Sequence, residues 1–414
     1  MIHQEKKIQI KYQPGSIIIG FYSFWLITAA VYSQLVWVGS LPNIIYIYFA
    51  ALFVFASCYY LIPLIINRKF SITNQTIFLN YSTLNKLCKV SITIYFLLLV
   101  LLVFWMNVLY SEAGDSLIKL RYLRFDRPLF DNFIFSAVHG WVMAFFALVS
   151  AISASLYSLI FKKNYYLYLI LFFCFIESVV TLGRFPFVKV IVVYFLIASS
   201  IFGFRFLLGK VLKYVAPILY FVLIIIVIRN QLAGLSFFDG LIFALNDVLL
   251  YGISGFFIIE NHLQNPSSFL HLPHSYGRSM MGIFDSFYVY VNQYMGGDAE
   301  PVSGRNGGFL REVVHISTTK NGDLIRGNAF GGWFSTLYRD GGYLWVFLAS
   351  AIFALYLRLC EYISRRSNFY LFHIFFIISS SALSLFHSLI ESLSIVLIIL
   401  TPFLLKLLIS KVKV

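Results

Sequence analysis

The fold is decided by residues 90–110, VSITIYFLLLVLLVFWMNVLY. This stretch contains no charged side chain and matches the roughly 20 apolar residues that cross the hydrocarbon core of a bilayer as a helix. The whole chain has the same character, with 60% hydrophobic and 12% charged residues and a mean hydropathy of +0.85, whereas soluble domains carry about 25% charged residues. The composition predicts an all-α, polytopic membrane protein.

Apolar runs of similar length lie on both sides of this stretch. They occupy residues 16–38, 44–66, 132–160, 165–182, 186–204, 214–228 (a shorter run), a run that ends near residue 357, then 369–386 and 389–410. We therefore expect about ten transmembrane helices in one integral membrane domain. Residues 1–228 form a seven-helix bundle, residues 333–414 form a three-helix segment, and residues 229–332 form a large loop region between them.

Two segments of the loop region are apolar enough to raise the helix count to eleven or twelve. They are residues 238–259 and 279–295. Polar side chains in both, such as Asp247 and Asp285, are unfavourable in hydrocarbon. We therefore expect these segments to form interfacial or re-entrant helices.

The distribution of lysine and arginine predicts the orientation. Loops that face the cytoplasm carry an excess of these residues. With the N-terminus inside, the inner segments collect 13 lysines and five arginines, and both termini are cytoplasmic. Although the net charge is +14, the basic residues lie between apolar runs and form no single patch, which argues against nucleic-acid binding. The positions of the four cysteines indicate neither a disulfide framework nor a cysteine metal site.

The outer segments, by contrast, contain three lysines and ten arginines. Arginine binds phosphate or carboxylate through two parallel hydrogen bonds, which lysine does not do. This asymmetry favours a phosphate-bearing ligand at the outer face. The alternative is that these arginines pair with acidic residues on the same side. The ten are Arg121, Arg124, Arg127, Arg184, Arg229, Arg278, Arg305, Arg311, Arg326 and Arg339.

Several local patterns resemble the Wzy-type O-antigen polymerases, or oligosaccharide repeat-unit polymerases. Residues 181–184, TLGR, close one apolar run, and Arg229 is followed after ten residues by Gly240. Residues 328–334, NAFGGWF, and 338–342, YRDGG, are similar to the junction between the large loop and the next span. Arg311 and Gly327, with fifteen residues between them, fit a variant of the loop motif.

This resemblance implies a glycosyltransferase in the bacterial inner membrane. Its substrates are undecaprenyl-diphosphate-linked oligosaccharides, which are joined at the periplasmic face with the lipid diphosphate as leaving group. No metal or other cofactor is implied. Membrane lipid surrounds the protein, and the resemblance suggests a Wzz-type chain-length regulator as partner.

Transfer of this kind needs cations for the leaving diphosphate and a base for the acceptor hydroxyl. The candidate base is His315, which would share a helix face with Arg311 four residues earlier. Glu312 and Asp340 are rival catalytic residues. The candidate diphosphate ligands are Arg184, Arg229, Arg305, Arg311 and Arg326.

Other polar side chains have simpler interpretations. Glu177 lies seven residues before Arg184 and either acts in the site or forms a structural ion pair there. We expect His262, His271 and His274 to be solvated loop residues. His139 and His373 are expected to form interfacial or inter-helix hydrogen bonds.

Three alternatives to a polymerase remain open. An O-antigen ligase differs only in its acceptor. Another lipid-linked-sugar glycosyltransferase would use acidic residues of an early outer loop, such as Glu112 and Asp131. A lipid-linked oligosaccharide flippase or transporter would usually show internal repeats and short loops, which this sequence lacks.

Overall fold

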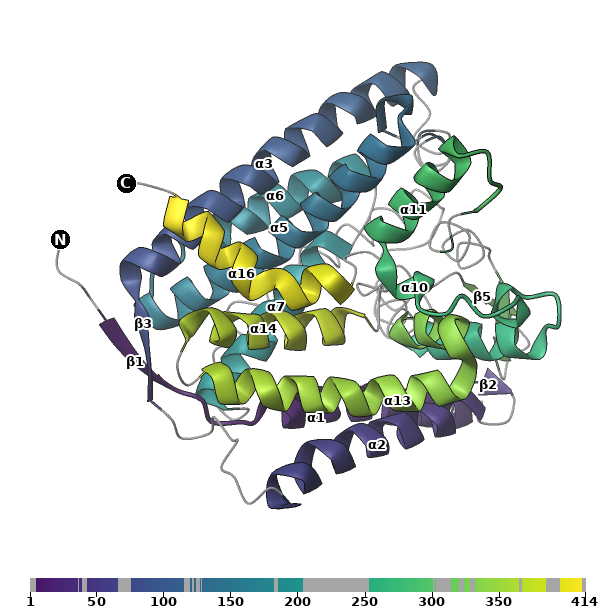
Figure 1. Cartoon of the computed structure of the whole chain (residues 1–414), viewed down its shortest axis with the longest axis horizontal. Coiled ribbons are helices and arrows are strands. Elements are labelled where there is room, and N and C mark those ends of the chain that lie inside the picture. Colours follow the sequence, from purple (N-terminus) through teal and green to yellow (C-terminus); the bar gives the residue numbers. More distant parts are fainter. Residues whose placement is uncertain are drawn as a thin grey trace.

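The computed structural model shows a helical bundle with a few short strands (Figure 1). It describes residues 5–35, 37–38, 43–65, 76–114, 120, 123, 127, 129–181, 185–203, 253–300, 302, 314–319, 324–327, 332–364, 367–384 and 395–411.

Within these described residues, six helices are long and apolar enough to cross a membrane, as expected for a multi-pass membrane protein. Most of the described part of each expected apolar run is helical, with residues 37–38 of the run 16–38 as an exception, and the run 214–228 lies outside the described residues. The six are α1 (Pro14–Leu35), α2 (Asn43–Ile65), α3 (Tyr81–Glu112), α5 (Phe133–Phe161), α7 (Phe185–Phe202) and α13 (Gly332–Ser364). Three shorter apolar helices accompany them: α6 (Tyr165–Thr181), α14 (Asn368–Leu383) and α16 (Ile395–Lys411).

Helix α5 forms the centre of the bundle. Of the 18 most apolar consecutive residues in its segment Val138–Phe161, 83% are buried. The corresponding share in α1, α2, α3 and α13 is only 28–39%. It packs against α3, α6 and α7, while α13 runs along α2 and α14 (Figure 1). Buried Ser150, Ser153 and Ala154 fit this position, because small side chains let helices approach closely within a membrane.

The two ends of the bundle carry different structures. At one end, β1 (Glu5–Gln9) pairs antiparallel with β3 (Thr76–Asn80), near the C-terminal end of α16 (Figure 1). The opposite end holds η2 (Phe269–His271), α10 (Arg278–Met281), α11 (Ile283–Tyr294) and an antiparallel sheet of order β2-β4-β5 (Figure 1). Its strands are β2 (Trp37–Val38), β4 (Val314–Thr319) and β5 (Leu324–Gly327).

These strands correct the all-α expectation in detail. The helix predicted over residues 16–38 ends at Leu35, and Trp37 and Val38 pair instead with Thr319 and Thr318. The helix expected around His315 is also wrong, because residues 314–319, VHISTT, form a strand. β-Branched residues favour a strand when a partner strand is available, and β4 has two partners, β2 far back in the chain and β5 directly after it.

A buried ion pair ties α13 to α2 near the end that carries β1. Arg358 Nη1 donates to Glu361 Oε2 at 2.9 Å, and Arg358 Nε donates to the Tyr59 carbonyl at 2.7 Å. The Tyr59 hydroxyl donates to the other Glu361 oxygen. Because Arg358 is 5% exposed and Glu361 is fully buried, this pair fixes the two helices relative to each other.

Candidate functional site

The candidate site begins at a kink in α13. Gly342 has φ 67° and ψ −159°, a backbone conformation that is essentially restricted to glycine. The kink separates a short first segment, which ends at Asp340, from the long apolar remainder of the helix. It presents the carbonyl groups of residues 339 and 340 to the chain segment before α10.

Asp340 holds that segment in place through a buried carboxylate. Its Oδ1 atom accepts hydrogen bonds from Ser275 Oγ at 2.6 Å and from the Ser279 backbone N–H at 2.9 Å. Arg339 Nη1 donates to the carbonyls of Leu272, at 3.0 Å, and Pro273. We call Ser275, Ser279, Arg339 and Asp340 the polar junction. Asp340 is 1% exposed, so its carboxylate organises this junction and does not face solvent.

A second buried carboxylate lies in α11, the helix that follows the polar junction segment in the chain. Asp285 is buried in α11 and accepts from Arg278 Nε at 2.6 Å and from the Val302 backbone N–H at 2.8 Å. Arg278 Nη2 also donates to the Glu300 carbonyl at 2.8 Å. This ion pair therefore anchors the chain just before the glycine-rich stretch 303–308.

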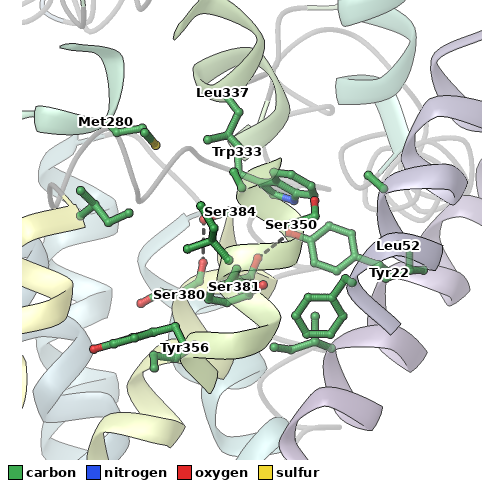
Figure 2. Close-up of a pocket in the computed structure, with 18 of the residues that line it drawn as sticks. Tyr22, Leu52, Met280, Trp333, Leu337, Ser350, Tyr356, Ser380, Ser381 and Ser384 are labelled. Atoms are coloured by element: carbon green, nitrogen blue, oxygen red, sulfur yellow. Dashed lines mark hydrogen bonds between the residues drawn. The ribbon is translucent and has the colours of Figure 1, made fainter. Parts of the chain in front are cut away.

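An apolar cavity of about 260 Å³ lies among α1, α2, α13, α14 and α16. Met280 and Leu337 lie at one end of it and Tyr356 lies at the other (Figure 2). Three of its lining residues, Leu348, Ile352 and Ile399, are 44–55% exposed. The cavity therefore reaches the apolar outer surface between α13 and α16.

Few polar groups face this cavity. Tyr22 donates its hydroxyl to the Ser381 carbonyl at 2.6 Å, and Ser384 donates to the Ser380 carbonyl at 2.7 Å (Figure 2). Trp333 packs edge-on against Tyr22. Apolar cavities of about 150 Å³ remain dry and bind hydrocarbons, so this larger one suits a hydrocarbon chain.

The cavity and the polar junction are neighbours. Met280 lines the cavity and directly follows Ser279, whose N–H binds Asp340. Leu337 lines the cavity one helical turn before Asp340. An amphiphile with its chain in the cavity would therefore carry its polar head next to the junction.

Two sequence-predicted site residues meet in the β4–β5 hairpin. His315 is the direct cross-strand partner of Arg326. The register shifts between His315 and Ser317, so one extra residue of β4 forms a bulge beside this pair. Bulges re-aim neighbouring side chains and are frequent next to active sites.

The remaining predicted site residues are distributed unevenly. Asp340 lies in the polar junction, and His315 and Arg326 are paired by their backbones. Arg184, Arg229, Arg305, Arg311 and Glu312 lie outside the described residues. The structure thus places His315 and Arg326 opposite each other on adjacent strands, and it places Asp340 in the hydrogen-bonded polar junction.

The arginines that were expected at the outer face and have described side chains all contact groups of the protein itself. Arg127 pairs with Glu112 at 2.5 Å, Arg278 pairs with Asp285, and Arg339 binds backbone carbonyls. For Arg127 and Arg278 the alternative of pairing with acidic residues is confirmed, whereas Arg339 binds backbone carbonyls instead. A diphosphate site would rest on the other arginines.

Buried polar residues within the bundle mostly link helices. His139 bonds the Leu98 carbonyl at 2.8 Å and His373 bonds the Tyr356 hydroxyl at 2.7 Å, which confirms the expected inter-helix role. Glu177 accepts a hydrogen bond from Tyr95 of α3.

His262 is a correction. It is 5% exposed and contacts Ser268 Oγ at 3.0 Å, whereas a solvated loop position was expected. The helix before residue 265 packs its last turns under the η2 segment, and that packing buries the imidazole.

Sequence reasoning missed Ser275, Ser279 and the cavity. The glycines at 277, 282, 341 and 342 were the available signal, since Gly277, Gly282 and Gly342 adopt positive φ and shape the junction. Within the described residues, no group of three His, Cys, Asp or Glu side chains is placed to hold a metal ion. Comparison with protein-family models, curated proteins and solved structures finds no match for this chain.

Proposed function

We propose that this protein is a polymerase of lipid-linked oligosaccharide repeat units, acting at the periplasmic face of a bacterial inner membrane. The donor is a glycan on undecaprenyl diphosphate, and the acceptor is a hydroxyl of the next lipid-linked unit. The bond between the anomeric carbon and the diphosphate oxygen breaks, and a new carbon–oxygen bond forms to the acceptor. The diphosphate leaves with the bonding electron pair.

One observation carries this proposal: an apolar cavity that opens between α13 and α16 lies directly beside a buried polar junction. A polyprenyl diphosphate matches these two parts, because it has a long hydrocarbon chain for the apolar cavity and a compact charged head for the polar junction. In this proposal the chain enters laterally past Leu348 and Ile352. Its head then lies near Met280, at the level of the polar junction.

The hairpin supplies the chemistry in this proposal. His315 takes the proton of the acceptor hydroxyl, because an imidazole titrates near neutral pH. Arg326, its cross-strand partner, neutralises charge on the departing diphosphate together with Arg184, Arg229, Arg305 and Arg311. Asp340 acts as a positioning residue through Ser275 and Ser279. A Wzz-type chain-length regulator is the proposed partner.

Deletion of the gene in its own host tests the proposal. We expect long glycan ladders to disappear while single repeat units remain attached to the lipid core. Loss of every repeat unit would contradict a polymerase and favour a flippase or a ligase. The direct assay uses the purified protein with one defined lipid-linked repeat unit. We expect dimeric and longer glycans to form, with one undecaprenyl diphosphate released for each new linkage, and an absence of products longer than the starting unit would overturn the proposal.

A further inference from the structure

Helix α11 exposes mainly apolar side chains and buries polar ones, the reverse of a surface helix on a soluble protein. Its exposed side chains are apolar or aromatic except for Gln293, whereas Asp285 and Ser286 are buried. Six exposed residues share one side of the helix and its C-terminal cap: Phe284, Phe287, Tyr288, Val291, Tyr294 and Met295, with exposed fractions from 38% to 85%; Tyr290, 49% exposed, lies beside this group. We call the six residues of the group the aromatic face.

The aromatic face is one continuous stripe. At about 100° of rotation per residue, its six positions fall within an arc of about 120°, and Asp285, Ser286 and Val289 lie on the opposite side. This inward polar side has partners in the protein, because Asp285 binds Arg278 and the Val302 N–H. On the outward side the Arg278 guanidinium lies near the Tyr288 ring, and the six side chains otherwise keep 38–85% of their surface exposed.

The dimensions of α11 exclude a spanning role. It has 12 residues, which gives a length of about 18 Å at 1.5 Å per residue, while the hydrocarbon core is about 30 Å thick. The helix also starts at a sharp break, where Gly282 has φ 51°. It packs against α5 at the end of the bundle that holds α10 and the three-stranded sheet (Figure 1). A helix placed there lies where the spanning helices leave the bilayer.

We propose that α11 lies in the membrane interface, with its aromatic face inserted among the lipid headgroups and upper acyl chains. Amphipathic helices of this kind bury their apolar face about 5–10 Å deep, and tyrosine is enriched at that level. The proposal does not depend on the polymerase activity. It assigns a lipid surface as the partner of this face.

The chemistry of the face favours lipid over sugar. A sugar platform needs hydrogen-bonding groups beside the rings, and this face offers only the hydroxyls of Tyr288 and Tyr294. The nearest cation, Arg278, lies 5.0 Å from the Tyr288 ring centroid but is already bonded to Asp285 and Glu300. Phe284, Phe287 and Val291 offer apolar surface alone.

The position of α11 also fixes the end of the cavity that Met280 lines. Gly282 directly joins α10 to α11, and the Arg278–Asp285 ion pair locks the two helices together. Met280 of α10 lines the cavity and Ser279 binds Asp340. If α11 is held at the lipid surface, α10 and the Met280 end of the cavity are therefore held at that same surface.

Depth-dependent fluorescence quenching tests the proposal on the full chain. An NBD fluorophore is attached to Phe287→Cys, in a Cys58→Ser background that removes the one cysteine that is not buried. The matched control is Asp298→Cys, an exposed position just beyond α11. Both proteins are reconstituted into vesicles of phosphatidylethanolamine and phosphatidylglycerol. The parent background, labelled in the same way, gives the signal to be subtracted.

We expect NBD at position 287 to emit at shorter wavelength and to be quenched by lipids that carry a nitroxide near the headgroup. Aqueous iodide should quench it several-fold less than NBD at position 298. Equal iodide quenching at both positions would show a water-facing surface and overturn the proposal. Protection at position 287 from both iodide and nitroxide lipid would indicate a protein partner and overturn it equally. Labelled proteins are compared only if they elute as the same monodisperse species.

Discussion

His315 of β4 lies directly opposite Arg326 of β5, at a point where a bulge interrupts the pairing of the two strands. Their separation in sequence gives no indication of this proximity. The pair places a histidine, the residue proposed as base, and an arginine, whose planar fork can bind phosphate through two hydrogen bonds, on adjacent strands. Its position next to a bulge makes it the sharpest residue-level test of the proposed polymerase.

Substitution of this pair should shorten the glycan ladder in a non-additive way. Arg326→Lys keeps the charge but removes the planar fork, and His315→Gln removes the titratable nitrogen. If both residues act on one transferred unit, the double variant loses little more activity than the worse single variant. Ladder length on gels of extracted glycan gives the measurement. Thr318→Ser, on the same strand and paired with Leu324, is the control, and full-length ladders from Arg326→Lys would contradict a bidentate role.

Filling the cavity should abolish polymerisation without unfolding the protein. Ala349 lines the cavity from α13, so Ala349→Phe places a ring in the space proposed for the lipid chain. Cavity filling usually leaves stability equal or higher. We expect loss of long ladders and an unchanged thermal midpoint in detergent. Ala351→Phe makes the same change two residues away, at a half-buried position that does not line the cavity. Equal activity of the two variants would contradict the cavity as a substrate site.

Breaking the Arg358–Glu361 ion pair should strongly destabilise the bundle. Arg358→Met leaves the Glu361 carboxylate buried without its cation, a change that costs about 3–5 kcal/mol in free energy of unfolding. The double variant Arg358→Met, Glu361→Leu should recover much of this loss, because no buried charge remains.

Thermal unfolding in a single detergent measures both effects. The comparison variant is Arg127→Met, which removes the cation of the Arg127–Glu112 pair; the two side chains are 45% and 39% exposed. It should change stability by less than about 1 kcal/mol. An equal loss of stability in Arg127→Met and Arg358→Met would contradict the expectation that the buried ion pair contributes more to stability than the exposed one.

The α13 kink should tolerate only glycine at position 342. With φ 67° and ψ −159°, an alanine there is strained by about 1–3 kcal/mol, although its Cβ would meet only His274, at 3.5 Å. We expect Gly342→Ala to lower the thermal midpoint and to reduce ladder length, since the kink positions Asp340. Gly140→Ala in α5, where a Cβ meets nothing within 4 Å, should leave the protein equal or more stable. If Gly342→Ala leaves the thermal midpoint and the ladder length unchanged, the kink does not depend on a glycine at position 342.

Much of the fold was predictable because hydropathy is a local property that adds along the chain. The run at 165–182 became α6 with one end shifted by a single residue, and the run at 90–110 became α3, which begins earlier, at Tyr81. The boundary expected at residue 332 coincides with the start of α13. Residues 279–295 form the short, broken α10–α11 segment, while its position in the membrane interface and the full count of ten spans stay predictions.

Much less of the candidate site was predictable, because hydrogen-bond partners depend on which distant segments meet. Asp340 was a candidate base, but the fold surrounds it with Ser275 and Ser279, and the chain alone does not reveal those neighbours. The same holds for Tyr95, which lies 82 residues before the carboxylate it binds.

The sequence by itself determined that this protein is built from apolar helices with a polar region between residues 229 and 332, because lipid selects long uncharged runs wherever they occur. Only the tertiary structure decided which side of α11 faces outwards, which arginines are already paired, and where a cavity remains. Those features arise from contacts between surfaces that are remote in the chain, and a one-dimensional pattern of residues does not encode their meeting.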